Sequence, residues 1–230
     1  NCFIQFTSPL QRLSSGHYDR NRAFRIRYET LKHKHRLQQS ETHGLLGART
    51  SLLAHQVYIA DQVSRRHAPR VLLADEVGLG KTIEAGMILH AQIHNGLASR
   101  ALIVVPSTLI HQWLIEMLRR FNLRFSVFDR ERVDSLTEEG IENPFETEQL
   151  VLCDQNLLLN EQIQEQALAA KWDILVVDEA HHLHWSETES SPEYQCIEAL
   201  AERSHGVLLL TATPEQAGIE SNIPCLRFLN

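Results

Sequence analysis

Short apolar runs alternate with longer amphipathic stretches along the chain from residue 52 onward. The short runs are rich in Val, Leu and Ile and have the length of buried strands, whereas the stretches between them repeat apolar residues at helical spacing. The expected strands are residues 71–74, 101–105, 124–128, 149–153, 173–178 and 206–211. The expected helices are residues 52–63, 82–94, 109–121, 156–170 and 192–203, with an exposed, partly helical loop at 129–148.

Strands that are apolar throughout and separated by helices indicate a parallel sheet covered on both faces. We therefore predict an α/β fold, a three-layer α/β/α domain with a mainly parallel central sheet. Sheets of this kind bind ligands at the carboxyl ends of their strands. Each motif described below lies at such an end.

Composition narrows the class of protein. The chain has 230 residues, 43% of them hydrophobic, which is enough for one ordinary domain with a full core. The four cysteines lie far apart and form no C-x-x-C pair, so neither a disulfide framework nor a zinc ribbon is indicated. We expect a reducing, cytoplasmic setting. No apolar run has the length of a membrane span.

The net charge of −7 hides an asymmetry along the chain. Residues 17–37 hold seven Lys and Arg and two Asp and Glu, a net charge of +5, so the rest of the chain carries −12. A basic N-terminal extension thus precedes an acidic body. We interpret residues 1–45 as a linker with this basic arm, which is either a solvated helix or a surface that contacts nucleic acid or the body. Residues 46–230 are the domain.

The first motif follows the expected strand at 71–74 and reads "DEVGLGKT" at residues 75–82. Triphosphate binding needs glycines that turn backbone N–H groups inward, a helix N-terminus aimed at the anion, a lysine and a hydroxyl. Gly78, Gly80, Lys81 and Thr82 supply these groups in order, before an expected helix. Position 75 departs from the usual pattern, because it is Asp where that pattern has its first glycine.

Two more motifs follow later strands. "DEAH" at residues 178–181 places two adjacent carboxylates after an apolar strand. Asp178 can hold Mg²⁺, and Glu179 can accept a proton from an attacking water. "TATP" at residues 211–214 follows the last strand and offers two hydroxyls to the carboxylates or a phosphate. Two histidines, His90 and His94, have metal-ligand spacing, but we expect them on an exposed helix face.

The three motifs in this order resemble motifs I, II and III of the superfamily 2 helicase-like ATPases. The acidic start of "DEVGLGKT" is similar to motif I of the SWI/SNF-type double-stranded-DNA translocases. Longer stretches, among them "HQWLIEMLRRFNLRF" and "VVDEAHHLHWSE", resemble the bacterial RNA-polymerase-associated branch of this family over nearly the whole chain. Ala212 is a departure, since many members have glycine there. The resemblance implies a RecA-like P-loop domain with an N-terminal basic extension.

The resemblance implies ATP and Mg²⁺ as cofactors, and RNA polymerase with DNA or RNA as partners. It implies ATP hydrolysis that drives movement along nucleic acid and promotes polymerase recycling in transcription, in the bacterial cytoplasm and associated with the nucleoid. The nucleotide-binding residues are Asp75, Glu76, Val77, Gly78, Leu79, Gly80, Lys81 and Thr82, with Gln56 on the adenine. The catalytic set is Lys81, Asp178 and Glu179, the Mg²⁺ ligands are Thr82 and Asp178, and the DEAH box is Asp178, Glu179, Ala180 and His181. Pro106, Ser107 and Thr108 touch the nucleic-acid backbone, and Thr211 and Thr213 couple that contact to the nucleotide.

In this family ATP lies between two RecA-like lobes, and the second lobe supplies arginine fingers. The chain begins at Asn1 rather than Met and leaves no room for a second lobe after Pro214. We expect a piece of a longer protein, monomeric, that binds ATP and hydrolyses it very poorly. Two alternatives remain open, a nucleotide-binding and interaction module without turnover and a lobe of a DEAH-type RNA helicase, although Asp75 and Glu76 disfavour the helicase.

Overall fold

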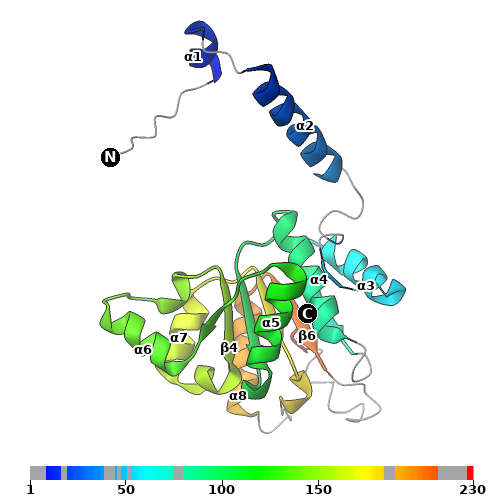
Figure 1. The fold of residues 1–230 in the computed structure, drawn as a ribbon. Helices are drawn as coiled ribbons and strands as arrows, with labels where there is room; N and C mark the ends of the chain where they lie inside the picture. The colour runs from blue at the N-terminus through cyan, green and yellow to red at the C-terminus, as the bar shows by residue number, and fades with distance from the viewer. Residues whose placement is uncertain are drawn as a thin grey trace. The chain divides into compact units, whose positions relative to one another are not determined.

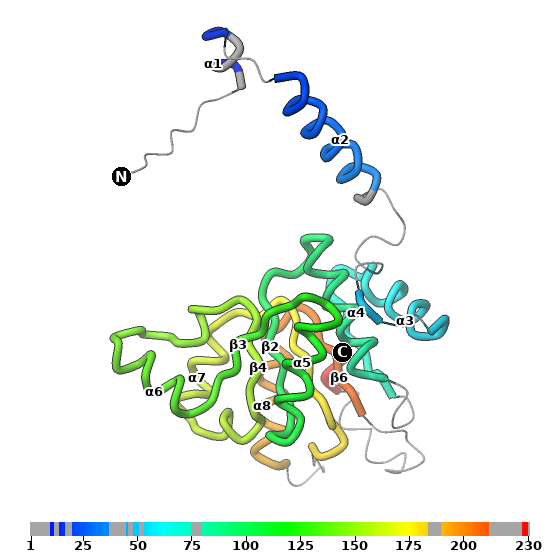
Figure 2. The backbone as a smooth tube through the Cα atoms, viewed as in Figure 1, coloured from blue at the N-terminus to red at the C-terminus, as the bar shows by residue number. Residues whose placement is uncertain are grey.

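The computed structural model describes residues 9–16, 20–38, 45, 48–50, 53–74, 80–183, 190–211 and 227–229. The chain divides into two compact units, residues 1–43 and residues 44–230. None of the described helices is long and apolar enough to cross a membrane. Figures 1 and 2 show the elements of each unit.

The described residues of the first unit form two helices, α1 (Pro9–Ser14) and α2 (Asn21–Gln38). The side chains of α2 are almost all exposed, including the large apolar ones of Phe24, Tyr28 and Leu31. The rings of Phe24 and Tyr28 stack with centroids 6.4 Å apart, as residues four apart on a helix can do. The basic extension is therefore a helix that carries its positive charge and its aromatic rings on the surface.

The second unit is built on one six-stranded sheet in the order β1-β6-β5-β2-β4-β3, and every described strand pairing is parallel. The strands are β1 (Arg70–Leu73), β2 (Ala101–Val105), β3 (Ser126–Phe128), β4 (Leu150–Asp154), β5 (Ile174–Val177) and β6 (Gly206–Leu210). The helices are α3 (Ala54–Ser64), α4 (Lys81–His94), α5 (Ile110–Phe121), α6 (Arg130–Glu138), α7 (Glu161–Ala169) and α8 (Pro192–Arg203). In the part of this unit that the structure describes, short 3₁₀ segments lie at Ser107–Leu109, Pro144–Glu146, Gln155–Leu159 and Ala180–His182.

Helices cover both faces of this sheet. Successive side chains of a strand point to opposite faces, and each face has its own apolar core. Leu102 and Val104 of β2 pack into the core with α6, α7 and α8. Ala101, Ile103 and Val105 of the same strand pack into the core with α3, α4 and α5. The predicted three-layer α/β/α fold is confirmed, and the sheet that was expected to be mainly parallel is parallel throughout its described strands.

Three expectations about single segments were wrong. Residues 156–170 are not one helix, because the Asn160 side chain accepts the N–H of Ile163 and starts α7 as a separate helix. Part of the loop at 129–148 is buried, since Phe145 has no exposed surface and its ring lies 5.1 Å from that of Phe128. His90 is buried rather than exposed, and its ring lies 6.1 Å from that of Phe121.

Candidate nucleotide site

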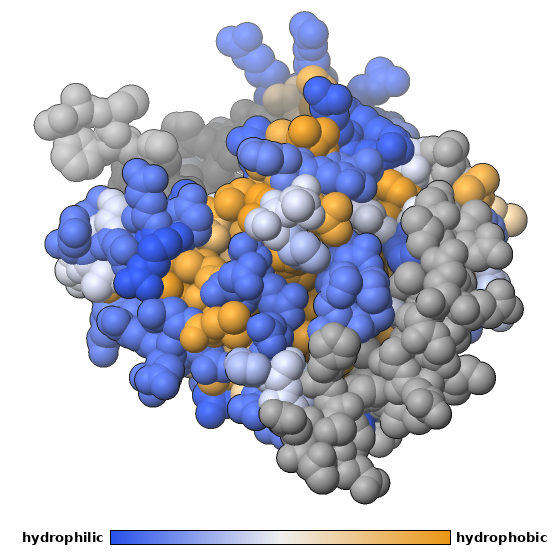
Figure 3. Space-filling view, turned by 90° about the horizontal axis from the view of Figure 1, so that it is seen from below, coloured by the Kyte–Doolittle hydropathy of each residue, from blue (hydrophilic) through white to orange (hydrophobic). Residues whose placement is uncertain are grey.

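The strand order brings the sequence motifs to one edge of the sheet. Leu73 pairs with Leu210, Val177 pairs with Leu209, and Val104 pairs with Val177. The carboxyl ends of β1, β6, β5 and β2 therefore lie side by side, and these are the strands that the motifs follow. Figure 3 looks at the molecule from below, onto this end, where hydrophilic side chains surround smaller apolar patches.

Gly80 begins the helix that follows β1. Its φ of +92° lies in the left-handed region that favours glycine, and its carbonyl accepts the N–H groups of Ile83 and Glu84. A Cβ at this position would lie 2.6 Å from the side-chain nitrogen of Gln56. The left-handed backbone therefore favours glycine here, and a Cβ would also require the Gln56 side chain to shift.

Gln56 is brought to this turn by α3, although the two residues are far apart in sequence. Its side chain is only 3% exposed, so the amide is held against the start of α4. Lys81 and Thr82 form the first helical positions after Gly80 and are half-buried. N–H groups in the first turn of a helix have no carbonyl partner within the helix and favour an anion there.

Asp178 directly follows β5 and is 7% exposed. Its N–H donates to the carbonyl of Val104, which ties it to the neighbouring strand. Its carboxylate accepts the Trp113 indole N–H at Oδ2 and the Glu179 N–H at Oδ1, each at 2.8 Å. A buried carboxylate with fixed orientation thus stands at the strand end.

The surroundings of Asp178 shift the pKa of its carboxyl in both directions. Burial raises the pKa of its carboxyl above the ordinary value, and the adjacent charge of Glu179 adds to that rise. The hydrogen bonds from Trp113 and Glu179 and the charge of Lys81 act in the opposite direction. Since a nearby cation favours the ionised form, this site favours a positively charged ligand.

Glu179 has a left-handed backbone, with φ 52° and ψ 42°. Its carboxylate oxygen Oε2 lies 3.2 Å from Nδ1 of His181, and both side chains are partly exposed. Burial and the neighbouring His182 lower the pKa of His181 below its ordinary value, so the imidazole is neutral near pH 7. The 3₁₀ turn Ala180–His182 sets this geometry.

The remaining motif residues lie along the same edge in different environments. Ser107 and Thr108 are exposed in the 3₁₀ turn after β2, and Pro106 is half-buried before them. Thr211 has no exposed surface, and its N–H donates to the carbonyl of Leu73. Asp75, Glu76, Val77, Gly78 and Leu79 lie outside the described residues, as do Ala212 and Thr213.

The described part of the chain holds no group of three His, Cys, Asp or Glu side chains arranged to bind a metal alone. A Mg²⁺ ion bound with a nucleotide needs only one or two protein ligands, because phosphate oxygens and water complete its octahedron. The Thr82 hydroxyl and the Asp178 carboxylate are oxygen donors of the kind that Mg²⁺ prefers. These residues therefore fit a metal that arrives with its nucleotide.

Sequence reasoning missed one residue of this site. Trp113 lies in the helix that was expected at residues 109–121, and it is fully buried on α5. Its indole N–H also donates to the Asp178 carboxylate across a separation of 65 residues. No local pattern shows such a contact, although a buried tryptophan always raises the question of where its N–H finds a partner.

Comparison with known proteins agrees with the geometry. The chain is 57% identical over 228 residues to the RNA polymerase-associated protein RapA of Vibrio campbellii, covering 99% of this chain and 23% of that protein. It is 58% identical over 228 residues to RapA of Cronobacter sakazakii, covering 99% of this chain and 24% of that protein.

Among solved structures, the Sulfolobus solfataricus SWI2/SNF2 ATPase core in complex with dsDNA matches with a TM-score of 0.67 and 20% identity. The match covers 81% of this chain and 37% of that one, and it supports the fold. The model of the SNF2-related domain matches residues 22–230. The chain therefore belongs to the family of SNF2-related domains.

Proposed function

We propose that this chain is the ATP-binding lobe of a SWI/SNF-type, ATP-dependent nucleic-acid translocase that associates with RNA polymerase and promotes its recycling in transcription. The observation that carries the proposal is that two charged motifs follow β1 and β5, whose carboxyl ends lie on the same edge of the sheet with β6 between them. The helix that starts at Gly80 and Lys81 follows β1, and the Asp178 carboxylate follows β5. These are the parts that a triphosphate and its metal require.

In this proposal Lys81 and the first-turn N–H groups of α4 bind the β- and γ-phosphates, together with residues 75–79. Thr82 and Asp178 hold Mg²⁺, which neutralises charge that develops on the phosphates. Glu179 polarises the attacking water, and its partly exposed side chain allows access to that water. Gln56, which packs against Gly80, reads the adenine. Asp178, Glu179, Ala180 and His181 form the DEAH box.

The nucleic-acid roles rest on position along the same edge. Pro106, Ser107 and Thr108 contact the backbone of DNA or RNA, and the exposure of Ser107 and Thr108 leaves them available for such a contact. Thr211 and Thr213 couple that contact to the nucleotide. The RapA relatives are RNA polymerase-associated by name, and the Sulfolobus neighbour was solved with dsDNA. We propose that RNA polymerase and nucleic acid are also partners of the protein to which this chain belongs.

The proposal also covers the division of the chain into parts and the place of the protein in the cell. Residues 46–230 form the lobe and residues 1–45 form a basic linker, in a protein of the bacterial cytoplasm that associates with the nucleoid. The chain spans about a quarter of the length of the RapA relatives. We propose that a second lobe supplies the arginine fingers, which contribute on the order of 10³–10⁵ to turnover in other P-loop enzymes. The 230-residue chain alone then binds MgATP, remains monomeric and hydrolyses ATP very slowly.

Titration of the 230-residue chain with MgATP tests the phosphate site. Lys81→Ala removes the charge at the helix start and is expected to abolish measurable MgATP binding without changing the midpoint of thermal unfolding. Lys171→Ala, which removes an exposed lysine outside the site, is the matched control and keeps wild-type affinity. Unchanged MgATP affinity in Lys81→Ala would refute the assignment.

A further inference from the structure

Two donors hold the two oxygens of the Asp178 carboxylate, and they come from different parts of the fold. The backbone N–H of Glu179 is fixed by the chain itself, because it belongs to the next residue. The indole N–H of Trp113 comes from α5, on the face of the sheet that also carries α3 and α4. The backbone donor follows from the turn alone, whereas the indole donor requires a tryptophan at this one position of α5.

An indole is suited to orient a carboxylate and to do nothing else. It has one N–H donor and no acceptor, so it neither takes a proton nor binds a metal. Each carboxylate oxygen has two lone pairs, so one accepted hydrogen bond still leaves capacity for a cation. Groups that donate hydrogen bonds to metal-binding carboxylates fix the direction of those ligands.

The indole is itself held firmly. Trp113, Met117 and Phe121 lie on one side of α5 and are buried in the same core. A side chain in a close-packed core has little rotational freedom. The Trp113 N–H therefore stays where the fold places it, and the orientation of Asp178 follows from the packing of α5.

A second buried tryptophan shows what a purely structural indole looks like in this chain. Trp172 is 2% exposed, and its N–H donates at 2.9 Å to the backbone carbonyl of Ala167, in the core on the other face of the sheet. The chemistry of the two indoles is the same. Of these two described indoles, that of Trp113 donates to an ionisable side chain, at the carboxyl end of the sheet.

We propose that Trp113 is a positioning residue for Asp178. Its indole N–H holds the carboxylate in the orientation in which it takes Mg²⁺ together with bound ATP. The inference rests on the proposed function, since it assigns a partner to the metal-binding group of that site.

The test compares Trp113→Phe with Trp172→Phe in the 230-residue chain. Each substitution removes one buried N–H and keeps an aromatic ring. We measure ATP affinity by calorimetric titration at a series of Mg²⁺ concentrations and in EDTA. In Trp113→Phe we expect the Mg²⁺ concentration for half-maximal effect to rise about tenfold, in the range found when partners of metal ligands are removed. Affinity in EDTA stays at the wild-type value, and Trp172→Phe changes neither quantity.

The same Mg²⁺ dependence in Trp113→Phe as in the wild type and in Trp172→Phe would overturn the positioning role, while the proposed function would stand. Absence of MgATP binding in the wild-type chain would overturn the proposed function, and the inference with it. The two failures are thus distinguishable within one set of titrations.

A second measurement covers the case in which Trp113→Phe does not fold. The chain has three tryptophans, at 113, 172 and 185. Labelling with ¹⁵N-tryptophan gives three indole N–H signals, and single substitutions of Trp172 and Trp185 by Phe identify the signal of Trp113 by elimination. We expect this signal to shift when Mg²⁺ is added to the ATP-bound chain. If the Trp113 signal does not shift when Mg²⁺ is added, although MgATP binds, the inference is overturned.

Discussion

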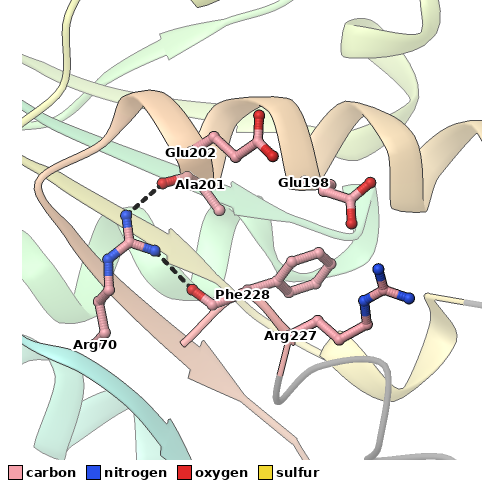
Figure 4. Close-up of a pocket in the computed structure, with 6 residues that line it drawn as sticks. All are labelled: Arg70, Glu198, Ala201, Glu202, Arg227 and Phe228. Carbon is pink, nitrogen blue, oxygen red and sulfur yellow. Dashed lines mark hydrogen bonds between the residues drawn. The ribbon is translucent and has the colours of Figure 1, made fainter. Parts of the chain in front are cut away.

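The two ends of the central sheet both carry charged groups but use them differently. At the amino ends of the strands, Arg70 donates to the carbonyl oxygens of Ala201, Ser204 and Phe228 at 2.7–2.8 Å. Figure 4 shows the guanidinium of Arg70 pointing at two of these carbonyls, beside the hollow lined by α8 and Phe228. The guanidinium thus donates to backbone carbonyls from two segments of the chain, the end of α8 and Phe228.

Asp173, before β5, follows the same rule with the opposite charge. One carboxylate oxygen accepts the N–H and hydroxyl of Ser99 and the N–H of Arg100. The other oxygen lies 3.4 Å from Nδ1 of His205. The charges at this end of the sheet thus bind the chain's own backbone and join segments together.

At the carboxyl ends, Asp178 also accepts hydrogen bonds from the chain, but a second carboxylate lies directly beside it. Asp178 and Glu179 are adjacent carboxylates, and Glu179 holds a left-handed backbone that costs energy for any residue with a Cβ. Adjacent carboxylates and left-handed residues with a Cβ both cost energy, and they are frequent at functional sites. A left-handed backbone alone does not mark a site, because Lys171 before β5 has φ 41°. From this comparison we infer that the amino end of this sheet contributes to stability, whereas the carboxyl end holds the groups that we propose to bind the nucleotide.

The largest effect that would test this comparison is on stability at the amino end. Arg70→Met removes the guanidinium that donates to three backbone carbonyls, of which that of Ala201 also accepts the N–H of Ser204, so we expect the free energy of unfolding to fall by about 3 kcal/mol. Affinity for MgATP, measured on the folded variant, stays unchanged. Urea unfolding followed by circular dichroism measures the loss.

The matched control for Arg70 is Arg65→Met on the surface of α3. Arg65 is 58% exposed and pairs with Asp61, so its removal is expected to cost no more than about 0.5 kcal/mol. If both variants lost the same small amount, the hydrogen bonds of Arg70 would not stabilise the fold, and the comparison between the two ends would fail.

A smaller effect, with a defined dependence on pH, is expected at Asp173. Partial burial raises the pKa of its carboxyl, but the hydrogen bonds from Ser99, Arg100 and His205 outweigh this, so that the pKa lies below the ordinary value of 3.8. A group with a lowered folded-state pKa stabilises the fold above its unfolded-state pKa, and this contribution is lost as the pH falls through the folded-state value.

Asp173→Asn should therefore be less stable than the wild type at pH 7, by about 1 kcal/mol for the weakened hydrogen bonds. The difference should shrink as the pH falls below 3.8. Asp134→Asn, at an exposed pair with Arg130, is the control and should show almost no difference at either pH. Urea midpoints measured from pH 7 to pH 3 decide this, and a gap for Asp173→Asn that is constant with pH would contradict the prediction.

Hydrophobic periodicity predicted the bounds of an element correctly where the same pattern of buried and exposed residues continues along its whole length. Ala101–Val105 and Pro192–Arg203 begin and end at the predicted residues. It failed where a single polar side chain redirects the backbone, as Asn160 does before α7. It also failed for His90, because burial in a helix depends on what packs against it, and Phe121 is 31 residues away.

The candidate site, like the fold, could be predicted from the sequence only in part. Short motifs placed Gly80, Lys81 and Asp178 at strand ends, because phosphate and metal binding constrain neighbouring residues in the sequence. The contacts of Gln56 with Gly80 and of Trp113 with Asp178 join segments that only the folded sheet brings together. The sequence contains no local signal for either contact.

The smallest expected effect is that of Glu179→Gly on stability. Its sign is the opposite of the usual effect of glycine. Glycine in place of another residue normally destabilises a protein, because it makes the unfolded chain more flexible. At φ 52° the left-handed backbone of Glu179 costs about 1–2 kcal/mol for a residue with a Cβ, and glycine removes that cost.

Glu179→Gly should therefore be as stable as the wild type or more stable, by up to about 1 kcal/mol, in urea unfolding. Glu179→Gln keeps the Cβ and the strain and should match the wild type within about 0.5 kcal/mol, which separates the backbone effect from the loss of charge. Ser135→Gly in the middle of α6, an ordinary helical position, should lower stability by about 0.5 kcal/mol. If Glu179→Gly lost as much as this control, Glu179 would not be strained, and the carboxyl end of the sheet would have given up no stability for binding.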